Sequence, residues 1–256
     1  MGRKDLMGRS QSFRHGGDVE IDPLRDAACR ANRDLARLGL VLMTFGNASV
    51  VDRAADLVAI KPSGVACADL EPEDVVIVRL STGEPAASHG RPSSDTPTHL
   101  ELYRRFAGLG AIVHTHSADA TAWAQARREI PALGTTHADH FRGAVPVTRP
   151  LTAAEIAGDY EHNTALVIVE RFAGNLDPLA IPGVLVALHG PFAWGPSPAE
   201  AVDNAAALEL VAGIASRQLA IGPLQPIAAE LLQRHFDRKH GPGAYYGQPA
   251  RPTTER

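Results

Sequence analysis

The order of the expected helices and strands is the feature that most constrains the fold of this chain. Apolar residues recur at helical spacing over residues 22–40, where Asp22 can cap a helix and Pro23 fits its first turn. Three short apolar stretches with turn signals then follow, and they predict the strands of a meander at residues 48–51, 57–61 and 75–80.

The rest of the chain mixes both kinds of element. Further helices are expected over residues 95–106, from residue 117, and over residues 152–160, 198–219 and 226–239. Further strands are expected over residues 111–115, 166–170 and 184–188. Because strands and helices are grouped as well as alternating, the order favours an α+β arrangement or an α/β fold of the three-layer α/β/α sandwich kind, around a central, mainly antiparallel sheet.

Length, charge and cysteine content narrow the function classes. The 256 residues suit one hydrophobic core, so a single domain is expected, with residues 249–256 as a flexible tail because they hold no apolar anchor. A formal charge of -4 gives no basic field, which disfavours nucleic acid and anionic membranes as partners. The chain has 2 cysteines and no apolar run in residues 1–20, so neither a disulfide framework nor a secretory signal is indicated and we expect a cytoplasmic protein.

Two histidines lie two positions apart in the strand-like segment 112–116, Ile-Val-His-Thr-His. His114 and His116 therefore project from the same face, about 7 Å apart along the chain, and two such rings can share one metal ion. His189 follows the expected strand over residues 184–188 and is the natural third ligand, which would leave an open position for substrate or water. In a chain with 11 histidines such a pair also arises by chance, so spacing alone leaves both interpretations open.

Two short segments have the composition of an anion site. Residues 93–95, Ser-Ser-Asp, stand at an expected helix start, where free backbone N–H groups collect. After Lys61, the Ser-Gly turn at residues 63–64 lets backbone N–H groups approach an anion closely. Both segments also have a purely local explanation, since Ser and Asp are good helix caps and Ser-Gly is a common turn.

Two further groups could act as an acid or a base. Asp139 ends the segment 134–139, in which a histidine and this carboxylate stand beside small and hydroxyl residues, although a solvated loop would have the same composition. Tyr246 follows Tyr245 near the C-terminus, where a tyrosine can donate a proton or simply pack its ring.

These segments form an ordered series of motifs. The series is Gly46-Asn47-Ala48-Ser49, Lys61-Pro62-Ser63-Gly64, Pro92-Ser93-Ser94-Asp95-Thr96-Pro97-Thr98-His99, His114-Thr115-His116-Ser117, Gly134-Thr135-Thr136-His137-Ala138-Asp139, His189-Gly190-Pro191-Phe192-Ala193-Trp194-Gly195 and Ala244-Tyr245-Tyr246-Gly247-Gln248. With it, the chain resembles the class II aldolase and L-ribulose-5-phosphate 4-epimerase family over nearly its whole length, and the epimerase branch most. The resemblance implies one class II aldolase-like domain over residues 21–248, preceded by a disordered or extended segment, residues 1–20.

The resemblance also implies roles for particular residues. The implied divalent metal is zinc, with manganese or cobalt as alternatives because imidazole suits several ions, and its site consists of Asp95, His114, His116 and His189. The implied contacts to the sugar phosphate substrate are Gly46, Asn47, Lys61, Ser63, Gly64, Ser93, Ser94 and Asp95. Asp139 and Tyr246 fall on the proposed catalytic acid/base pair of the family. His235 and Arg238 fall on substrate-binding residues that reach a neighbouring subunit's site, which implies a homo-oligomer, expected to be a homotetramer.

The activity implied is the interconversion of L-ribulose 5-phosphate and D-xylulose 5-phosphate, as in arabinose breakdown. The carbon that is inverted bears no acidic hydrogen, so such enzymes cleave and remake the C3–C4 bond. An aldolase acting on fuculose or rhamnulose phosphate shares this chemistry and stays an alternative, although Asp95, residues 136–139 and the Tyr-Tyr-Gly-Gln ending favour the epimerase. A non-catalytic module similar to the adducin head would be expected to lack the metal ligands, which are present here.

Overall fold

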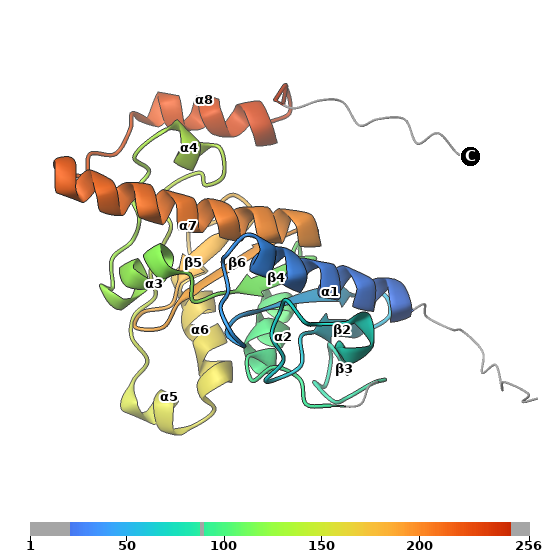
Figure 1. Cartoon of the computed structure of the whole chain (residues 1–256). Coiled ribbons are helices and arrows are strands. Elements are labelled where there is room, and N and C mark those ends of the chain that lie inside the picture. Colours follow the sequence, from blue (N-terminus) through green and yellow to red (C-terminus); the bar gives the residue numbers. More distant parts are fainter. Residues whose placement is uncertain (1–20, 88–89, 247–256) are drawn as a thin grey trace, which may run out of the picture.

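A six-stranded antiparallel sheet forms the centre of the computed structural model, which describes residues 21–87 and 90–246 (Figure 1). The strands are β1 (Asn47–Asp52), β2 (Leu57–Ile60), β3 (Val76–Arg79), β4 (Ala111–His114), β5 (Gly183–Leu185) and β6 (Pro191–Gly195). Their order is β3-β2-β1-β4-β6-β5, so the meander of the first three strands adds to β4 through β1. The segment 1–20 and the tail 249–256 lie outside the described residues.

Helices cover both faces of this sheet. They are α1 (Ile21–Arg37), the 3-10 turn η1 (Pro72–Asp74), α2 (Thr96–Arg105), α3 (Ala118–Gln125), α4 (Thr135–Ala138), α5 (Ala153–Ala157), α6 (Tyr160–Phe172), α7 (Pro198–Ile221) and α8 (Ala229–His240). None of these helices is both long and apolar enough to cross a membrane.

Alternation along the strands divides the apolar side chains between two cores. Ala111 and Val113 of β4 pack with α1 and the first turns of α7 on one face. Ile112, between them, points to the other face and packs with residues of α2 and α6, such as Tyr103 and Ile168. The expected three-layer arrangement around a mainly antiparallel sheet is therefore confirmed.

Three local expectations differ from the structure. The strand expected over residues 166–170 is wrong, because these residues form part of α6. The single helix expected over residues 152–160 is wrong as well, since α5 ends before Gly158 and α6 begins at Tyr160. The strand expected over residues 184–188 ends at Leu185, and β6 was not anticipated.

Candidate metal centre

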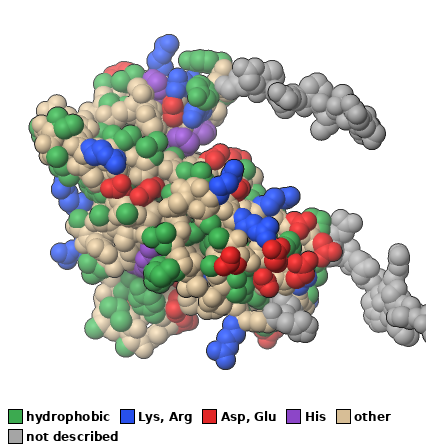
Figure 2. All heavy atoms as spheres, viewed as in Figure 1, with side chains coloured by type: hydrophobic (Ala, Val, Ile, Leu, Met, Phe, Trp, Pro, Cys, Tyr) green, Lys and Arg blue, Asp and Glu red, His purple; other side chains and the backbone are tan. Residues whose placement is uncertain are grey.

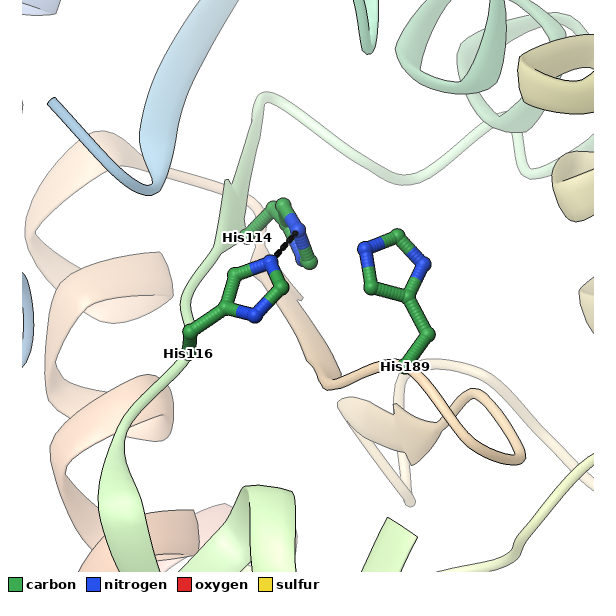
Figure 3. Close-up of side chains that lie close together, drawn as sticks. All are labelled: His114, His116 and His189. Carbon is green, nitrogen blue, oxygen red and sulfur yellow. Dashed lines mark hydrogen bonds between the residues drawn. The ribbon is translucent and has the colours of Figure 1, made fainter. Parts of the chain in front are cut away.

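Three histidines meet where β4 ends beside the turn between β5 and β6. Their candidate ligand atoms all lie within 4.8 Å of one another, and the rings face each other (Figure 3). His114 is the last residue of β4 and stacks on Phe192 of β6, with ring centroids 4.2 Å apart. His116 lies two residues beyond, and its Nε2 is 3.1 Å from Nε2 of His114. The structure thus brings together, as one triad, the three histidines that the sequence singled out.

The turn that carries His189 is held by backbone contacts. The N–H of His189 donates to the carbonyl of Val186 at 3.0 Å, and the N–H of Leu188 donates to the carbonyl of Ala124 at the end of α3, also at 3.0 Å. The next residue, Gly190, lies so close to β4 that an added Cβ would be 2.7 Å from the carbonyl oxygen of Thr115. A residue without a side chain therefore allows the turn to approach the other two ligands.

The protonation of the triad suits a divalent metal ion. Nδ1 of His114 lies 3.0 Å from the carbonyl oxygen of Pro191, which has no proton to give, so Nδ1 is the donor and Nε2 keeps its lone pair. Burial lowers the pKa of His114 to about 4 and holds the pKa values of His116 and His189 below the ordinary value. Neutral imidazoles at neutral pH are the form that coordinates metal, so this donor set fits a zinc-type ion.

The triad lines a cavity of about 390 Å³. The lining residues are Thr44, Phe45, Gly46, Asn47, Lys61, Ser63, Gly64, Ser93, Ser94, Asp95, His114, His116, Tyr160, Glu161 and His189. The two anion-binding segments suggested by the sequence therefore face the same space as the histidines.

Asp95 and Asn47 line this cavity from the starts of α2 and β1. Asp95 occupies the N-cap position of α2, yet its carboxylate makes no capping bond and instead accepts from Asn47 Nδ2 at 2.7 Å. Burial opposes the ionisation of Asp95, but the neighbouring histidines and the Asn47 hydrogen bond together lower its pKa below the ordinary value. Asp95 is not one of the three residues whose ligand atoms cluster, so its role as a fourth ligand stays a prediction.

Asn47 itself carries an unused acceptor. Its Nδ2 also donates to Ser93 Oγ at 3.1 Å, whereas its Oδ1 is buried without a partner among the described residues. Asn47 pairs with His114 across β1 and β4, so both side chains leave the sheet on the same face. An acceptor in this position suits a hydroxyl group of a ligand.

The backbone that precedes Asn47 is tightly constrained. Gly46 has a positive φ of 74°, and an added Cβ would lie 2.9 Å from the carbonyl oxygen of His114. Lys61 then connects this segment to the Ser-Gly turn, because its ammonium donates to the carbonyls of Val65 at 2.6 Å and of Thr44 and Pro62 at 3.3 Å. The Lys61 side chain is thus held by backbone carbonyls at the edge of the cavity.

The remaining predicted site residues form a second cluster, on α4 and α8. Arg238 donates to Asp139 through Nε at 3.0 Å, and its guanidinium lies 4.8 Å from the centre of the Tyr246 ring. Nδ1 of His235 is 3.1 Å from the same carboxylate. Burial opposes ionisation of Asp139, but the Arg238 and His235 hydrogen bonds lower its pKa. None of these four residues lines the cavity that holds the triad.

Figure 1 shows where this second cluster lies in the fold. Helix α8 packs against α4, and both lie beyond α7, on the side away from the sheet. Figure 2 shows basic and histidine side chains gathered over this part of the surface. The predicted residues therefore form two groups within one chain.

Four cavity residues were not anticipated from the sequence, and two of them, Thr44 and Phe45, directly precede Gly46. Phe45 places its ring 5.9 Å from that of His116, and its position directly before Gly46 could have indicated it. Tyr160 and Glu161 enter the cavity from the start of α6. No local motif marks them, since their place depends on how α6 packs on α2.

Comparison with known proteins decides the family. A model of the Class II Aldolase and Adducin N-terminal domain matches residues 26–216. The chain belongs to this family. The matched residues include β1, β4 and the turn that carries His189, so the whole triad lies within the family match.

Solved structures show the same fold. An L-fuculose 1-phosphate aldolase has a TM-score of 0.71 at 24% identity, with 84% of this chain and 95% of that chain covered. An L-fuculose-1-phosphate aldolase from Thermus thermophilus has a TM-score of 0.60 at 28% identity, covering 79% and 98%. A sugar-phosphate aldolase from Thermotoga maritima has a TM-score of 0.63 at 21% identity, covering 80% and 98%. The class II aldolase fold of this chain follows from these likenesses.

Proposed function

We propose that this class II aldolase family member is a metal-dependent epimerase that interconverts L-ribulose 5-phosphate and D-xylulose 5-phosphate. The observation that carries the proposal is the contact of Arg238 with both Asp139 and Tyr246, the two residues expected to act as acid and base. An aldolase needs one proton-transfer group at the cleaved carbonyl, whereas inversion needs proton transfer on both faces. Two such groups held by one guanidinium support the epimerase over the aldolase.

The cavity residues have separate tasks in this proposal. Ser63, Gly64 and Ser94 bind the phosphate with hydroxyl and backbone N–H groups, and the N–H groups of Gly64 and Ser94 donate to no other described residue. The free Oδ1 of Asn47 accepts a hydroxyl of the sugar. Retention of the phosphate keeps glycolaldehyde phosphate in the cavity while its aldehyde group turns over.

Proton transfer is assigned to Asp139 and Tyr246. One of them removes the proton of the C4 hydroxyl as the C3–C4 bond breaks, and the other returns a proton to the oxygen after the bond forms on the opposite face of the aldehyde. A divalent ion held by His114, His116 and His189 would supply Lewis-acid stabilisation of the charge that develops on the ketose oxygens.

The second cluster does not line the cavity of its own chain, so the proposal includes an oligomer. A neighbouring copy would bring its Asp139, His235, Arg238 and Tyr246 to the cavity described above. A homotetramer is the assembly that the resemblance implies.

The direct test is conversion of the substrate. Purified protein loaded with zinc should convert L-ribulose 5-phosphate to D-xylulose 5-phosphate, and the same protein treated with a chelator should not. Cleavage of fuculose or rhamnulose 1-phosphate to dihydroxyacetone phosphate, without conversion of the pentulose phosphate, would contradict the proposal and assign the chain to the aldolases, as the fold neighbours suggest.

Variants of the acid/base pair test the roles within the reaction. Asp139→Asn and Tyr246→Phe should each lower kcat by about 10²–10⁴-fold, the usual contribution of a positioned acid or base. Zinc content should stay the same, because neither residue belongs to the triad. Normal rates in both variants would reject these roles while leaving the metal site untouched.

A further inference from the structure

We infer that Tyr160 is a positioning residue for the metal centre: its hydroxyl accepts a hydrogen bond from Nδ1 of His189 and so directs Nε2 of that ring to the metal. The inference rests on the proposed metal-dependent function, and it concerns a residue for which neither the sequence motifs nor the family resemblance gives a role.

The geometry places the two groups side by side. The Tyr160 hydroxyl lies 3.5 Å from Nδ1 of His189, and the ring centroids are 6.2 Å apart. Within residues 21–87 and 90–246, this hydroxyl is the hydrogen-bond partner found for Nδ1 of His189. The distance is at the long end for a hydrogen bond, and both side chains are only half-buried.

A comparison within the triad gives the chemical reason. An imidazole that binds metal through one nitrogen normally donates from the other nitrogen to an oxygen acceptor, which fixes the tautomer and the direction of the ring. For His114 that acceptor is the carbonyl oxygen of Pro191, at 3.0 Å. For His189 the corresponding acceptor within reach is the Tyr160 oxygen.

The backbone of Tyr160 is anchored well enough to serve this purpose. Its carbonyl accepts from Thr164 Oγ1 at 2.9 Å, and the next carbonyl, that of Glu161, accepts from Thr98 Oγ1 of α2 at 2.6 Å. The first turn of α6 is therefore fixed to α2, which also begins beside the cavity at Asp95. A hydroxyl on a fixed helix start can hold the direction of a ring that sits on a turn.

A hydroxyl in this position keeps a proton for a second partner. Tyrosine oxygen accepts through its lone pairs and donates through its own hydrogen, so a bond from His189 leaves the O–H able to donate. Because Tyr160 lines the cavity, that O–H can reach the space assigned to the sugar phosphate. The positioning role thus does not compete with a contact to substrate.

The test compares Tyr160→Phe with Tyr245→Phe, which removes a hydroxyl from a tyrosine that is 70% exposed. The zinc dissociation constant is measured by competition with a chelating dye, and the tautomer of His189 is measured by ¹⁵N NMR of the histidine rings. We expect about a tenfold weaker zinc affinity for Tyr160→Phe, at the low end of the usual effect of outer ligand partners, and a loss of the single Nδ1–H tautomer. Tyr245→Phe should match the unaltered protein in both.

The outcomes separate this inference from the proposed function. Equal zinc affinity and an unchanged His189 tautomer in Tyr160→Phe would overturn the inference alone, and so would an equal loss of affinity in both variants. An unaltered protein that binds no zinc would overturn the metal-dependent function together with the inference.

Discussion

At the scale of single residues, Lys61 combines almost complete burial with a positive charge. Lys61 is 2% exposed, and burial lowers the pKa of its ammonium. The ammonium nevertheless donates hydrogen bonds to three backbone carbonyls. Replacement by Met keeps the volume of the side chain but leaves these acceptors without a donor. We expect Lys61→Met to lower the free energy of unfolding by about 1–3 kcal/mol, the cost of unsatisfied buried polar groups.

Urea denaturation measures this effect, with Lys239→Met as the matched control. Nζ of Lys239 lies 4.0 Å from the Asp139 carboxylate and 4.7 Å from the centre of the Tyr246 ring. Neither contact is a hydrogen bond to a buried carbonyl, so the same chemical change there should have a smaller effect. A Lys61→Met variant as stable as the control would mean that the segment before Asn47 and the Ser-Gly turn at residues 63–64 stay together without this ammonium.

Prediction of site residues from the sequence depended on whether a local motif carried them. The His-x-His pair indicated His114 and His116 because a strand places alternate side chains on one face, and the structure brings them together with His189. Tyr160 had no such signal, because its proximity to His189 depends on the packing of α6 against α2. The separation of Asp139 from the cavity had no local signal either, since no spacing in the sequence relates the two. The resemblance had assigned only His235 and Arg238 to a neighbouring subunit's site.

At the scale of elements, the contact of α4 with α8 depends on an ionised carboxylate. Hydrogen bonds from Arg238 and His235 outweigh burial and lower the pKa of Asp139, so its folded value lies below the unfolded value of about 3.9. The stability that it contributes is therefore fully present above about pH 4 and is lost as the pH falls through the folded value. Asp139→Asn should remove about 1 kcal/mol at pH 6, because partly screened hydrogen bonds to a charged group contribute in this range.

The difference in unfolding free energy between the unaltered protein and Asp139→Asn should therefore shrink as the pH falls below about 4. Chemical denaturation at a series of pH values measures it. A difference that stays constant over this range, or that grows as the pH falls, would contradict the pKa direction of Asp139.

The elements that the sequence misassigned are those in which local composition and packing disagree. Residues 166–169, Leu-Val-Ile-Val, are the kind of apolar run that a buried strand has, yet they belong to α6. The buried residues of that helix, which include Thr164, Ile168 and Phe172, recur at helical spacing, and their burial against α2 decides the matter. β6 begins at Pro191 and ends at Gly195, two residues that local rules assign to turns, and its partners β4 and β5 supply the pairing.

At the scale of the whole molecule, the layered arrangement could be predicted from the sequence, because the apolar periodicity of each helix or strand marks the face that it buries. The meander and the amphipathic α1 were anticipated from periodicity. In the structure the meander forms half of the sheet, and α1 packs against one face of it. The order in which β4, β6 and β5 join the meander was not, because strand pairing between distant segments leaves no local trace. The candidate metal centre depends on that order, since β1 next to β4 is what places Asn47 beside His114.

The proposed division of the site between subunits can be tested by mixing two impaired variants. His116→Ala damages the triad, and Tyr246→Phe damages the second cluster, so each variant by itself should have little epimerase activity. Hybrid oligomers formed by co-expression would contain some sites with an intact triad from one chain and an intact Tyr246 from its neighbour. Partial recovery of epimerase activity is expected. Mixing His116→Ala with His189→Ala is the control, and it should recover nothing because both changes fall in the triad of each chain. No recovery in the first mixture, from hybrids shown by mass spectrometry to contain both variants, would mean that each chain completes its own site and that the contact between α4 and α8 has another purpose.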